Sequence, residues 1–225
     1  MNTNSNSYTI IYASVMVVIV AFLLASVNSS LRDRQDRNVE LDTKKQILSS
    51  LGITEVEDAD AEFGNVVKSD MIVAEDGSMV KYDGKFVTAY EKEFKENGRA
   101  HVFVCEIDGK TKYVIPVFGA GLWGAIWGYV ALDEDKNTVF GTYFSHASET
   151  PGLGAEIATP RFRSLFVGKH VMEGEDIALS VVKNGKVANP EFEVDGISGG
   201  TITSTGVDAM LKSCMGHYTK FITAK

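Results

Sequence analysis

Residues 195–212 read DGISGGTITSTGVDAMLK, a loop rich in glycine and hydroxyl residues that runs into an amphipathic segment. Apolar side chains recur at i, i+3, i+4 and i+7 from Val207 to Cys214, which is the pattern of one buried helix face. The spacing predicts a helix over 204–216 whose N-cap is one of the hydroxyl residues 203–205. Free backbone N–H groups and hydroxyls then gather at the positive end of a helix dipole, where proteins bind anions such as phosphate.

The same pattern also fits an ordinary loop in front of a capped helix, and both interpretations stay open on these residues alone. No Gly-Lys-Ser/Thr follows the glycines, so the loop is not a P-loop. The glycines are not spaced G-x-G-x-x-G, so the loop is not a dinucleotide-binding fingerprint either. A serine hydrolase that uses Ser198 with His146 and Asp195 is a further alternative, although the chain has no G-x-S-x-G nucleophile elbow.

A second motif, SHASETPGLGAE at residues 145–156, lies upstream of this loop. Its Pro-Gly pair at 151–152 predicts a tight turn. Glu149 and Thr150 offer an acceptor and a hydroxyl to a ligand, and Leu153 offers an apolar face. An ordinary Pro-Gly turn explains the same residues if the motif is taken by itself.

A third stretch, GAGLWGAIWGYVAL at residues 119–132, is dense in glycine and contains Trp123 and Trp127. It fits a glycine-rich surface where a flat ligand approaches the backbone beside aromatic rings. It also fits a bend between two strands with both tryptophans packed in the core. Composition alone favours this second interpretation.

Taken together, the three stretches resemble the FMN-binding domains of the sodium-translocating NADH:quinone reductase and of the related Rnf electron-transport complex. Residues 195–201 look like the flavinylation motif D-x-x-S/T-G-A-T, with Gly200 where the family usually has alanine. Residues 145–154 are similar to H-x-E-T-P-G-L-G with one extra residue after His146, and residues 115–123 are similar to V/I-P-V-x-G-x-G-L-W. With the N-terminal anchor and the charged segment after it, the resemblance to the NqrC family of reductase subunits covers nearly the whole chain.

The resemblance implies a flavoprotein in which Thr201 carries FMN through a phosphoester bond that a separate flavin transferase makes. The residues expected at the cofactor are Asp195, Ser198, Gly199, Gly200, Thr201 and Thr203 of the first motif, Glu149, Thr150, Leu153 and Gly154 of the second, and Leu122 and Trp123 of the third. No catalytic residue, metal ligand or NADH-binding pattern is expected in this chain.

The resemblance also implies partners, namely the other subunits of a membrane respiratory complex that oxidises NADH, reduces ubiquinone and transports sodium. The chain would relay electrons between them and catalyse nothing alone. The equivalent covalent-FMN subunit of an Rnf-type complex is one alternative. A membrane-anchored binding domain without a cofactor is the alternative from another class of protein.

An uncharged apolar run, YTIIYASVMVVIVAFLLASV, occupies residues 8–27 and has the length of roughly 20 residues that spans a bilayer. A cleaved signal peptide is the competing interpretation, but the run exceeds the usual apolar region of roughly 7–15 residues and no positive charge precedes it. The expected parts are a tail at 1–7, a retained transmembrane helix at 8–27, a charged linker helix at 28–52, and an α+β domain at 53–225 with its FMN-binding portion at about 119–217.

The side of the membrane is the point on which two signals disagree. The linker helix is expected to begin after Ser29 or Ser30, which can cap it. Basic residues such as Arg32 and Lys44 follow the apolar span, and the positive-inside rule then places the domain in the cytoplasm. The family resemblance implies the opposite side. We follow the resemblance and expect a single-pass protein of a bacterial inner membrane with a periplasmic domain.

The domain itself shows hairpin signals. Asp-Gly turns at 76–77 and 108–109 separate strand-like runs, of which 101–107 and 112–118 form the clearest pair. Pro116 indicates that the second of these strands lies at an edge or ends there. Several short strands and a helix after the flavin loop predict an α+β fold with a mostly antiparallel sheet.

Charge and cysteine content exclude other classes. The net charge of −8 excludes the basic surface that nucleic-acid binding needs. Cys105 and Cys214 form no C-x-x-C pair, and the four histidines show no metal-ligand spacing. We expect two buried thiols, with a disulfide between them as the alternative outside the cytoplasm.

Overall fold

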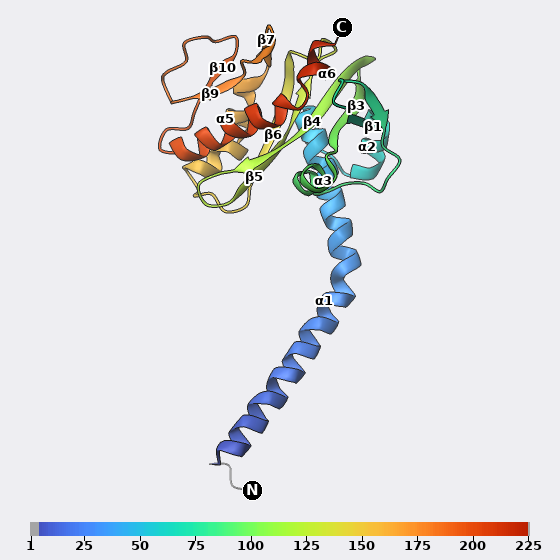
Figure 1. The fold of residues 1–225 in the computed structure, drawn as a ribbon, viewed down its shortest axis with the longest axis vertical. Coiled ribbons are helices and arrows are strands. Elements are labelled where there is room, and N and C mark those ends of the chain that lie inside the picture. Colours follow the sequence, from blue (N-terminus) through green and yellow to red (C-terminus); the bar gives the residue numbers. More distant parts are fainter. Residues whose placement is uncertain (1–4, 225) are drawn as a thin grey trace. The chain divides into compact units, whose positions relative to one another are not determined.

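The computed structural model describes residues 5–224, which divide into one unit that ends at Leu41 and a second that runs from Asp42 onward. The helix α1 (Asn6–Ser50) is continuous over 45 residues (Figure 1). An 18-residue window of α1 has a mean hydropathy of 2.7, and within residues 5–224 it is the one helix long and apolar enough to cross a membrane.

The predicted helix start after Ser29 or Ser30 is wrong, because α1 passes through both residues without interruption. A serine inside a helix costs only about 0.5 kcal/mol relative to alanine. The strongly helical residues on either side offset that cost, so a serine pair in the middle of a long helix is tolerated rather than used as a cap.

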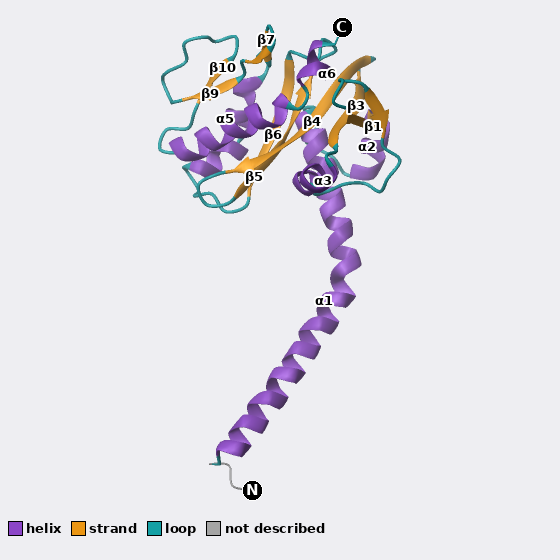
Figure 2. Cartoon of the chain, viewed as in Figure 1, coloured by secondary structure: helices purple, strands orange, loops and turns teal. Residues whose placement is uncertain are grey.

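The second unit is built on a six-stranded antiparallel sheet with the strand order β2-β1-β3-β4-β5-β6. Its strands are β1 (Val67–Val73), β2 (Met79–Lys81), β3 (Ala100–Ile107), β4 (Lys110–Ala120), β5 (Ala125–Leu132) and β6 (Val139–His146) (Figure 2). Asp108 and Gly109 have φ angles of 51° and 73°, the conformation that an Asp-Gly pair favours in a tight hairpin. The prediction of an α+β domain with a mostly antiparallel sheet is confirmed.

Helices and short strands complete the unit. The helices are α2 (Ala59–Val66), α3 (Tyr90–Asn97), α4 (Pro160–Arg163), α5 (Thr201–Gly216) and α6 (Thr219–Thr223), with the 3-10 turns η1 (Gly154–Ala158) and η2 (Ser164–Phe166). Two small sheets pair β7 (Met172–Glu173) with β8 (Asp176–Ile177), and β9 (Ser180–Val182) with β10 (Glu193–Asp195). The strand β10 runs parallel to β9 and leads directly into the glycine-rich loop 196–200 and then α5.

Each face of the six-stranded sheet has its own hydrophobic core. Neighbouring residues of a strand point to opposite faces, so β4 places Ile115 in one core and Val114 in the other. The helix α5 covers the first face, where Met210 is buried, and Figure 1 shows it lying across the sheet. The last turns of α1 contribute Leu48 to the second core.

The two cysteines lie in different cores, Cys105 in the one that contains Leu48 and Cys214 in the one that contains Met210. Both thiols are free and buried, so the prediction of buried thiols is confirmed and the disulfide alternative is wrong. Burial raises the pKa of the Cys105 thiol to about 12 and that of Cys214 to about 11. Both thiols therefore stay protonated at neutral pH.

Pro116 lies within β4, which continues past it to Ala120. The pairing of β4 with β3 ends at Val114, whereas the pairing with β5 continues, with Pro116 opposite Tyr129. At Pro116 the strand therefore has a neighbour on one side only. The prediction that this strand lies at an edge or ends at Pro116 is wrong, because β4 lies between β3 and β5 and runs on to Ala120. The proline is tolerated because the ladder with β3 has already ended at Val114, so no donor is missed on that side.

The last turns of α1 belong to the second unit. Ile47 and Leu48 are fully buried, and the Trp127 indole N–H donates to Gln46 Oε1 at 3.0 Å. The expected linker helix at 28–52 is therefore divided, with the part from Asp42 onward docked against the sheet.

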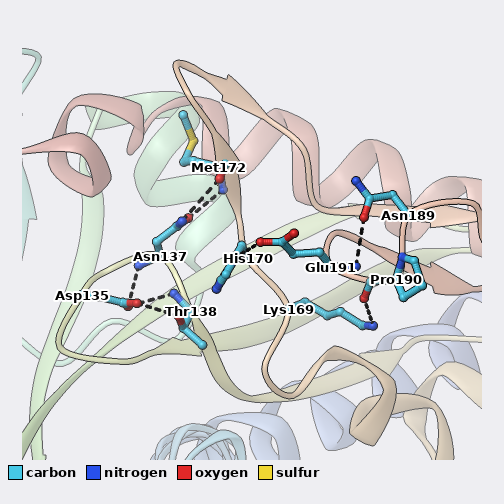
Figure 3. A network of polar contacts seen from close by, with 9 residues as sticks. All are labelled: Asp135, Asn137, Thr138, Lys169, His170, Met172, Asn189, Pro190 and Glu191. Carbon is cyan, nitrogen blue, oxygen red and sulfur yellow. Dashed lines mark hydrogen bonds and ion pairs between the residues drawn. The ribbon is translucent and has the colours of Figure 1, made fainter.

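A network of polar contacts ties the connection between β5 and β6 to the segments on either side of β7–β9 (Figure 3). The N–H of Met172 donates to Asn137 Oδ1 at 2.7 Å, and Asn137 Nδ2 donates to the Met172 carbonyl at 3.3 Å. His170 Nδ1 and Glu191 Oε1 lie 2.8 Å apart. These contacts fix the course of the chain ahead of loop 196–200.

Gly141→Ala tests the docking of the α1 end. A Cβ at Gly141 would lie 2.4 Å from the carbonyl oxygen of Ser50, so the two elements have to separate. We expect the free energy of unfolding to fall by about 1–3 kcal/mol, the usual cost of overpacking, in urea unfolding of the full chain in detergent. Gly216→Ala is the matched control, because nothing lies within 4 Å of its Cβ position. A Gly141→Ala chain as stable as the wild type contradicts the docked position.

Candidate cofactor site

The helix α5 begins three residues earlier than the sequence predicts. Its first residue is Thr201 and its N-cap is Gly200, without any side-chain cap. The predicted caps fail because their hydroxyls are engaged elsewhere. Thr203 Oγ1 donates to Glu149 Oε2 at 2.6 Å, and Ser204 Oγ donates to the Gly200 carbonyl at 2.9 Å. The N-terminus of this 16-residue helix therefore keeps unpaired backbone N–H groups without a capping side chain.

The five hydroxyl residues of this region differ in accessibility. Thr203 and Ser204 are buried, with exposed fractions of 1% and 4%. Thr205 is exposed but donates to the Thr201 carbonyl at 3.0 Å. Ser198 and Thr201 are exposed, and their hydroxyls make no hydrogen bond to any residue that the structure describes. Thr201 is thus the exposed and unengaged hydroxyl within the first turn of α5.

Glu149 joins the three motifs. Its Oε1 accepts the backbone N–H of Trp123 at 2.8 Å, and its Oε2 accepts the Thr203 hydroxyl. The residue is only 4% exposed. Gly121 and Gly154 make room for it, because a Cβ at either position would lie 2.4 Å from a carboxylate oxygen. The sequence places Glu149 at a ligand, whereas the structure brings it against Thr203 and the turn between β4 and β5.

Two opposing effects set the pKa of Glu149. Burial raises it, since the charged form loses water. Hydrogen bonds from the Thr203 hydroxyl and from the backbone N–H groups of Trp123 and Leu122 lower it, and together they outweigh burial. The net pKa of Glu149 lies below its ordinary value, so the carboxylate is ionised at neutral pH.

Large apolar side chains are exposed in the segments that Glu149 and the glycine-rich loop bring together. These four side chains, the apolar surface of the site, are Leu122, Trp123, Leu153 and Ile202. Trp123 is 65% exposed, so it does not pack in the core. The loop itself touches this surface, because a Cβ at Gly199, which has a φ of 79°, would lie 2.8 Å from Leu153 Cδ2. Exposed large apolar side chains on neighbouring segments are typical of a binding surface.

Gly200 is buried beneath the loop. A Cβ there would lie 3.0 Å from Ile197 Cγ2 and 3.3 Å from the Leu153 carbonyl carbon. An alanine at this position, as in the usual motif, requires its neighbours to shift by a few tenths of an ångström. Glycine therefore lets the loop and Leu153 lie slightly closer together.

A cavity of about 400 Å³ lies beside the loop and is lined by Asp195, Ser198 and Arg161 among others. Asp195 Oδ1 accepts the N–H of Gly185 at 2.7 Å, so this carboxylate holds the turn that follows β9. The exposed Arg161 is the cationic side chain in the lining. No group of three or more residues suited to a metal ion occurs within residues 5–224.

Three features of the site were not visible in the sequence. His146 Nδ1 accepts the backbone N–H of Glu149 at 3.2 Å, in spite of the extra residue between them. Ser204 Oγ accepts the N–H of Ile197 at 2.9 Å and so ties the loop to α5. Ile202 is exposed, and its position outside the apolar stripe of α5 is the one sequence signal that could have indicated this.

Thr150 is exposed, and its carbonyl accepts the N–H of Leu153 at 3.1 Å within the turn.

Residues 121–216 match the FMN-binding domain family. The interval begins at the turn that contacts Glu149 and ends at the last residue of α5. Fold and site together define the chain as one that carries an FMN-binding domain.

Whole-chain comparisons are more specific. The C subunit of the Na(+)-translocating NADH-quinone reductase from Vibrio anguillarum is 31% identical over 226 residues, with 92% of this chain and 89% of that protein covered. The C subunit from Haemophilus ducreyi is 32% identical over 236 residues, with 96% and 91% covered. The crystal structure of the C subunit from Parabacteroides distasonis superposes with a TM-score of 0.80 at 41% identity, over 87% of this chain and 98% of that one. The chain therefore belongs to the NqrC family, the C subunits of Na(+)-translocating NADH-quinone reductases.

Glu149→Gln tests the ionised state of the buried carboxylate. At pH 7 we expect it to lower the free energy of unfolding by about 1–3 kcal/mol, because a charged acceptor is lost. The folded-state pKa lies below the ordinary value of 4.5, so the stabilisation is fully present above about pH 4.5 and is lost as the pH falls through the folded-state pKa. The measurement is urea unfolding of both full chains from pH 7 to acid. A wild-type advantage that stays constant over this range contradicts the assignment.

Proposed function

We propose that Thr201 carries FMN through a phosphoester bond and that the chain relays single electrons between other subunits of a sodium-translocating NADH:quinone reductase. The observation that supports this most is the exposed, unengaged Thr201 hydroxyl in the uncapped first turn of α5. It lies inside the interval that matches the FMN-binding domain family.

The residues around Thr201 fit a flavin phosphate. A phosphodiester keeps one negative charge, and the N–H groups and dipole of the α5 N-terminus offset it. Neither Gly199 nor Gly200 carries a side chain that screens those N–H groups. When bound, FMN supplies one- and two-electron redox chemistry, and the protein orients it and tunes its potential.

Attachment requires a second protein. The Thr201 hydroxyl oxygen forms the new bond to phosphorus, the phosphoanhydride bond of a flavin dinucleotide breaks, and the nucleotide leaves. Within residues 5–224, no side chain forms a hydrogen bond with the Thr201 hydroxyl that would take up its proton, so a flavin transferase has to supply the base.

The apolar surface of Leu122, Trp123, Leu153 and Ile202 is the proposed seat of the isoalloxazine ring. Its four side chains are exposed and lie in the three motifs that flank the attachment threonine. Ser198 and Thr150 offer exposed hydroxyls in the same motifs. An indirect role is proposed for Asp195, Gly154 and Thr203. These residues shape the turns that hold the glycine-rich loop.

The apolar part of α1 is proposed as a retained single-pass anchor in a bacterial inner membrane, with the domain on the periplasmic side. The length and hydropathy of the helix support the anchor, and the family resemblance supports the side. Covalent attachment suits that location, because a flavin held by a phosphoester is not lost by dilution. Electron donor and acceptor are then neighbouring subunits of the complex.

Thr201→Ala tests the attachment site. The full chain is produced with a flavin transferase, denatured and examined for flavin fluorescence on a gel. We expect a fluorescent wild-type band, a dark Thr201→Ala band and a fluorescent Ser198→Ala band. Ser198→Ala is the matched control, because it removes the other exposed and unengaged hydroxyl of the loop.

A dark wild-type band, with the transferase active on a control substrate, would favour the anchored binding domain without a cofactor. A band that loses fluorescence in Ser198→Ala and keeps it in Thr201→Ala would move the attachment to Ser198.

A further inference from the structure

We propose that Glu149 is a positioning residue for flavin attachment, which acts through Thr203 to fix the first turn of α5 and with it the Thr201 hydroxyl. The inference rests on the proposed function of Thr201. Glu149 then acts through the protein and does not touch the flavin.

Glu149 is buried and its carboxylate is fully engaged by the protein. The residue is 4% exposed, and both carboxylate oxygens accept hydrogen bonds from the protein. Trp123 and Leu153, in contrast, have exposed apolar side chains. A flavin ring that lies on those side chains meets apolar atoms, whereas the carboxylate of Glu149 is covered and its oxygens are already engaged.

Thr203 connects Glu149 to the first turn of α5. It follows Thr201 by two residues within the same turn of α5, and its hydroxyl donates to Glu149 Oε2 at 2.6 Å. The other oxygen of Glu149 holds the Trp123 backbone at 2.8 Å. One side chain thus locks the start of α5 to the turn between β4 and β5. A misplacement of the reacting atoms by about 1 Å can lower a reaction rate about a hundredfold, so fixing the start of α5 affects the rate of attachment at Thr201.

The contact with Glu149 also distinguishes Thr203 from Thr201 as a possible acceptor of flavin. Thr203 is 1% exposed and its proton is donated to Glu149, so it is withheld from a transferase. The same bond that orients the turn therefore leaves Thr201 as the accessible threonine at its start.

His146 holds the backbone of Glu149 through a hydrogen bond. Its Nδ1 accepts the Glu149 backbone N–H at 3.2 Å. The order of contacts is His146 to Glu149 to Thr203. This arrangement gives the histidine of the second motif a role that does not require contact with the flavin.

The experiment is a double-mutant cycle on the full chain in detergent with purified transferase and a flavin dinucleotide. The variants are Glu149→Gln, Thr203→Val, the pair together, Thr203→Ser and Asp208→Asn. Asp208 is the matched control on α5, because its Oδ1 also accepts one hydroxyl and one backbone N–H, from Ser180 at 2.8 Å and Val181 at 2.9 Å. The readouts are the initial rate of flavin attachment and the hydrogen exchange of the flavin-free chain.

We expect Glu149→Gln and Thr203→Val each to slow attachment about tenfold, and the pair to be no slower than the slower single variant. Thr203→Ser keeps the hydroxyl and should restore the wild-type rate. Asp208→Asn should attach flavin at the wild-type rate. The Ser204 amide, which donates to the Gly200 carbonyl at 2.9 Å, should exchange faster in Glu149→Gln and Thr203→Val and not in Asp208→Asn.

Wild-type attachment in either Glu149→Gln or Thr203→Val overturns the proposal. So does an equal loss in Asp208→Asn, which would indicate lowered stability, or effects of the two variants that add, which would indicate independent roles. If the wild-type chain takes no flavin, the proposed function fails by itself. The exchange of Ser204 then decides the positioning role, and unchanged exchange in both variants overturns it.

Discussion

The close approach of α5 to β4 is the constraint on which the rest of the site depends. A Cβ at Gly206 of α5 would lie 2.4 Å from the Ala120 carbonyl oxygen, and a Cβ at Gly119 of β4 would lie 2.8 Å from Met210 Cβ. Because glycine stands on both elements, the helix lies against the strand more closely than any larger residue permits. This packing brings the start of α5 beside the turn that carries Trp123.

The buried carboxylate of Glu149 then connects the start of α5 with the turn between β4 and β5. An ionised side chain without partners is costly in the interior, and Glu149 avoids that cost through donors from two segments of the chain. Gly121 and Gly154 occupy the two positions where a side chain would displace the Glu149 carboxylate. Charge, glycine placement and the uncapped helix are therefore parts of one arrangement, and the exposed Thr201 is its outcome.

The sequence predicted those features that depend on local chemistry. The apolar run of α1 and the Asp-Gly hairpin at 108–109 follow from hydropathy and from turn preference, and both are present. The order of the flavin motifs indicated the family, which the comparisons confirm. Residue pattern alone did not distinguish a phosphate loop from an ordinary cap.

What the sequence missed depends on contacts between distant segments. The start of α5 was placed too late, because nothing local reveals that the Thr203 hydroxyl is taken by Glu149, 54 residues away. The docking of Trp127 on Gln46 likewise depends on which face of the sheet this residue of β5 meets. The exposure of Trp123 depends on how the turn between β4 and β5 lies against its neighbours. The cavity beside Ser198 is formed by segments that only the fold brings together.

Tandem mass spectrometry of the full chain, purified after production with a flavin transferase and then digested, decides where the flavin is attached. We expect one modified peptide, in which the FMN phosphate is bonded to Thr201 and to no other hydroxyl residue. FMN on Ser198 or Thr203, or flavin that separates from the chain on denaturation, would contradict attachment at Thr201.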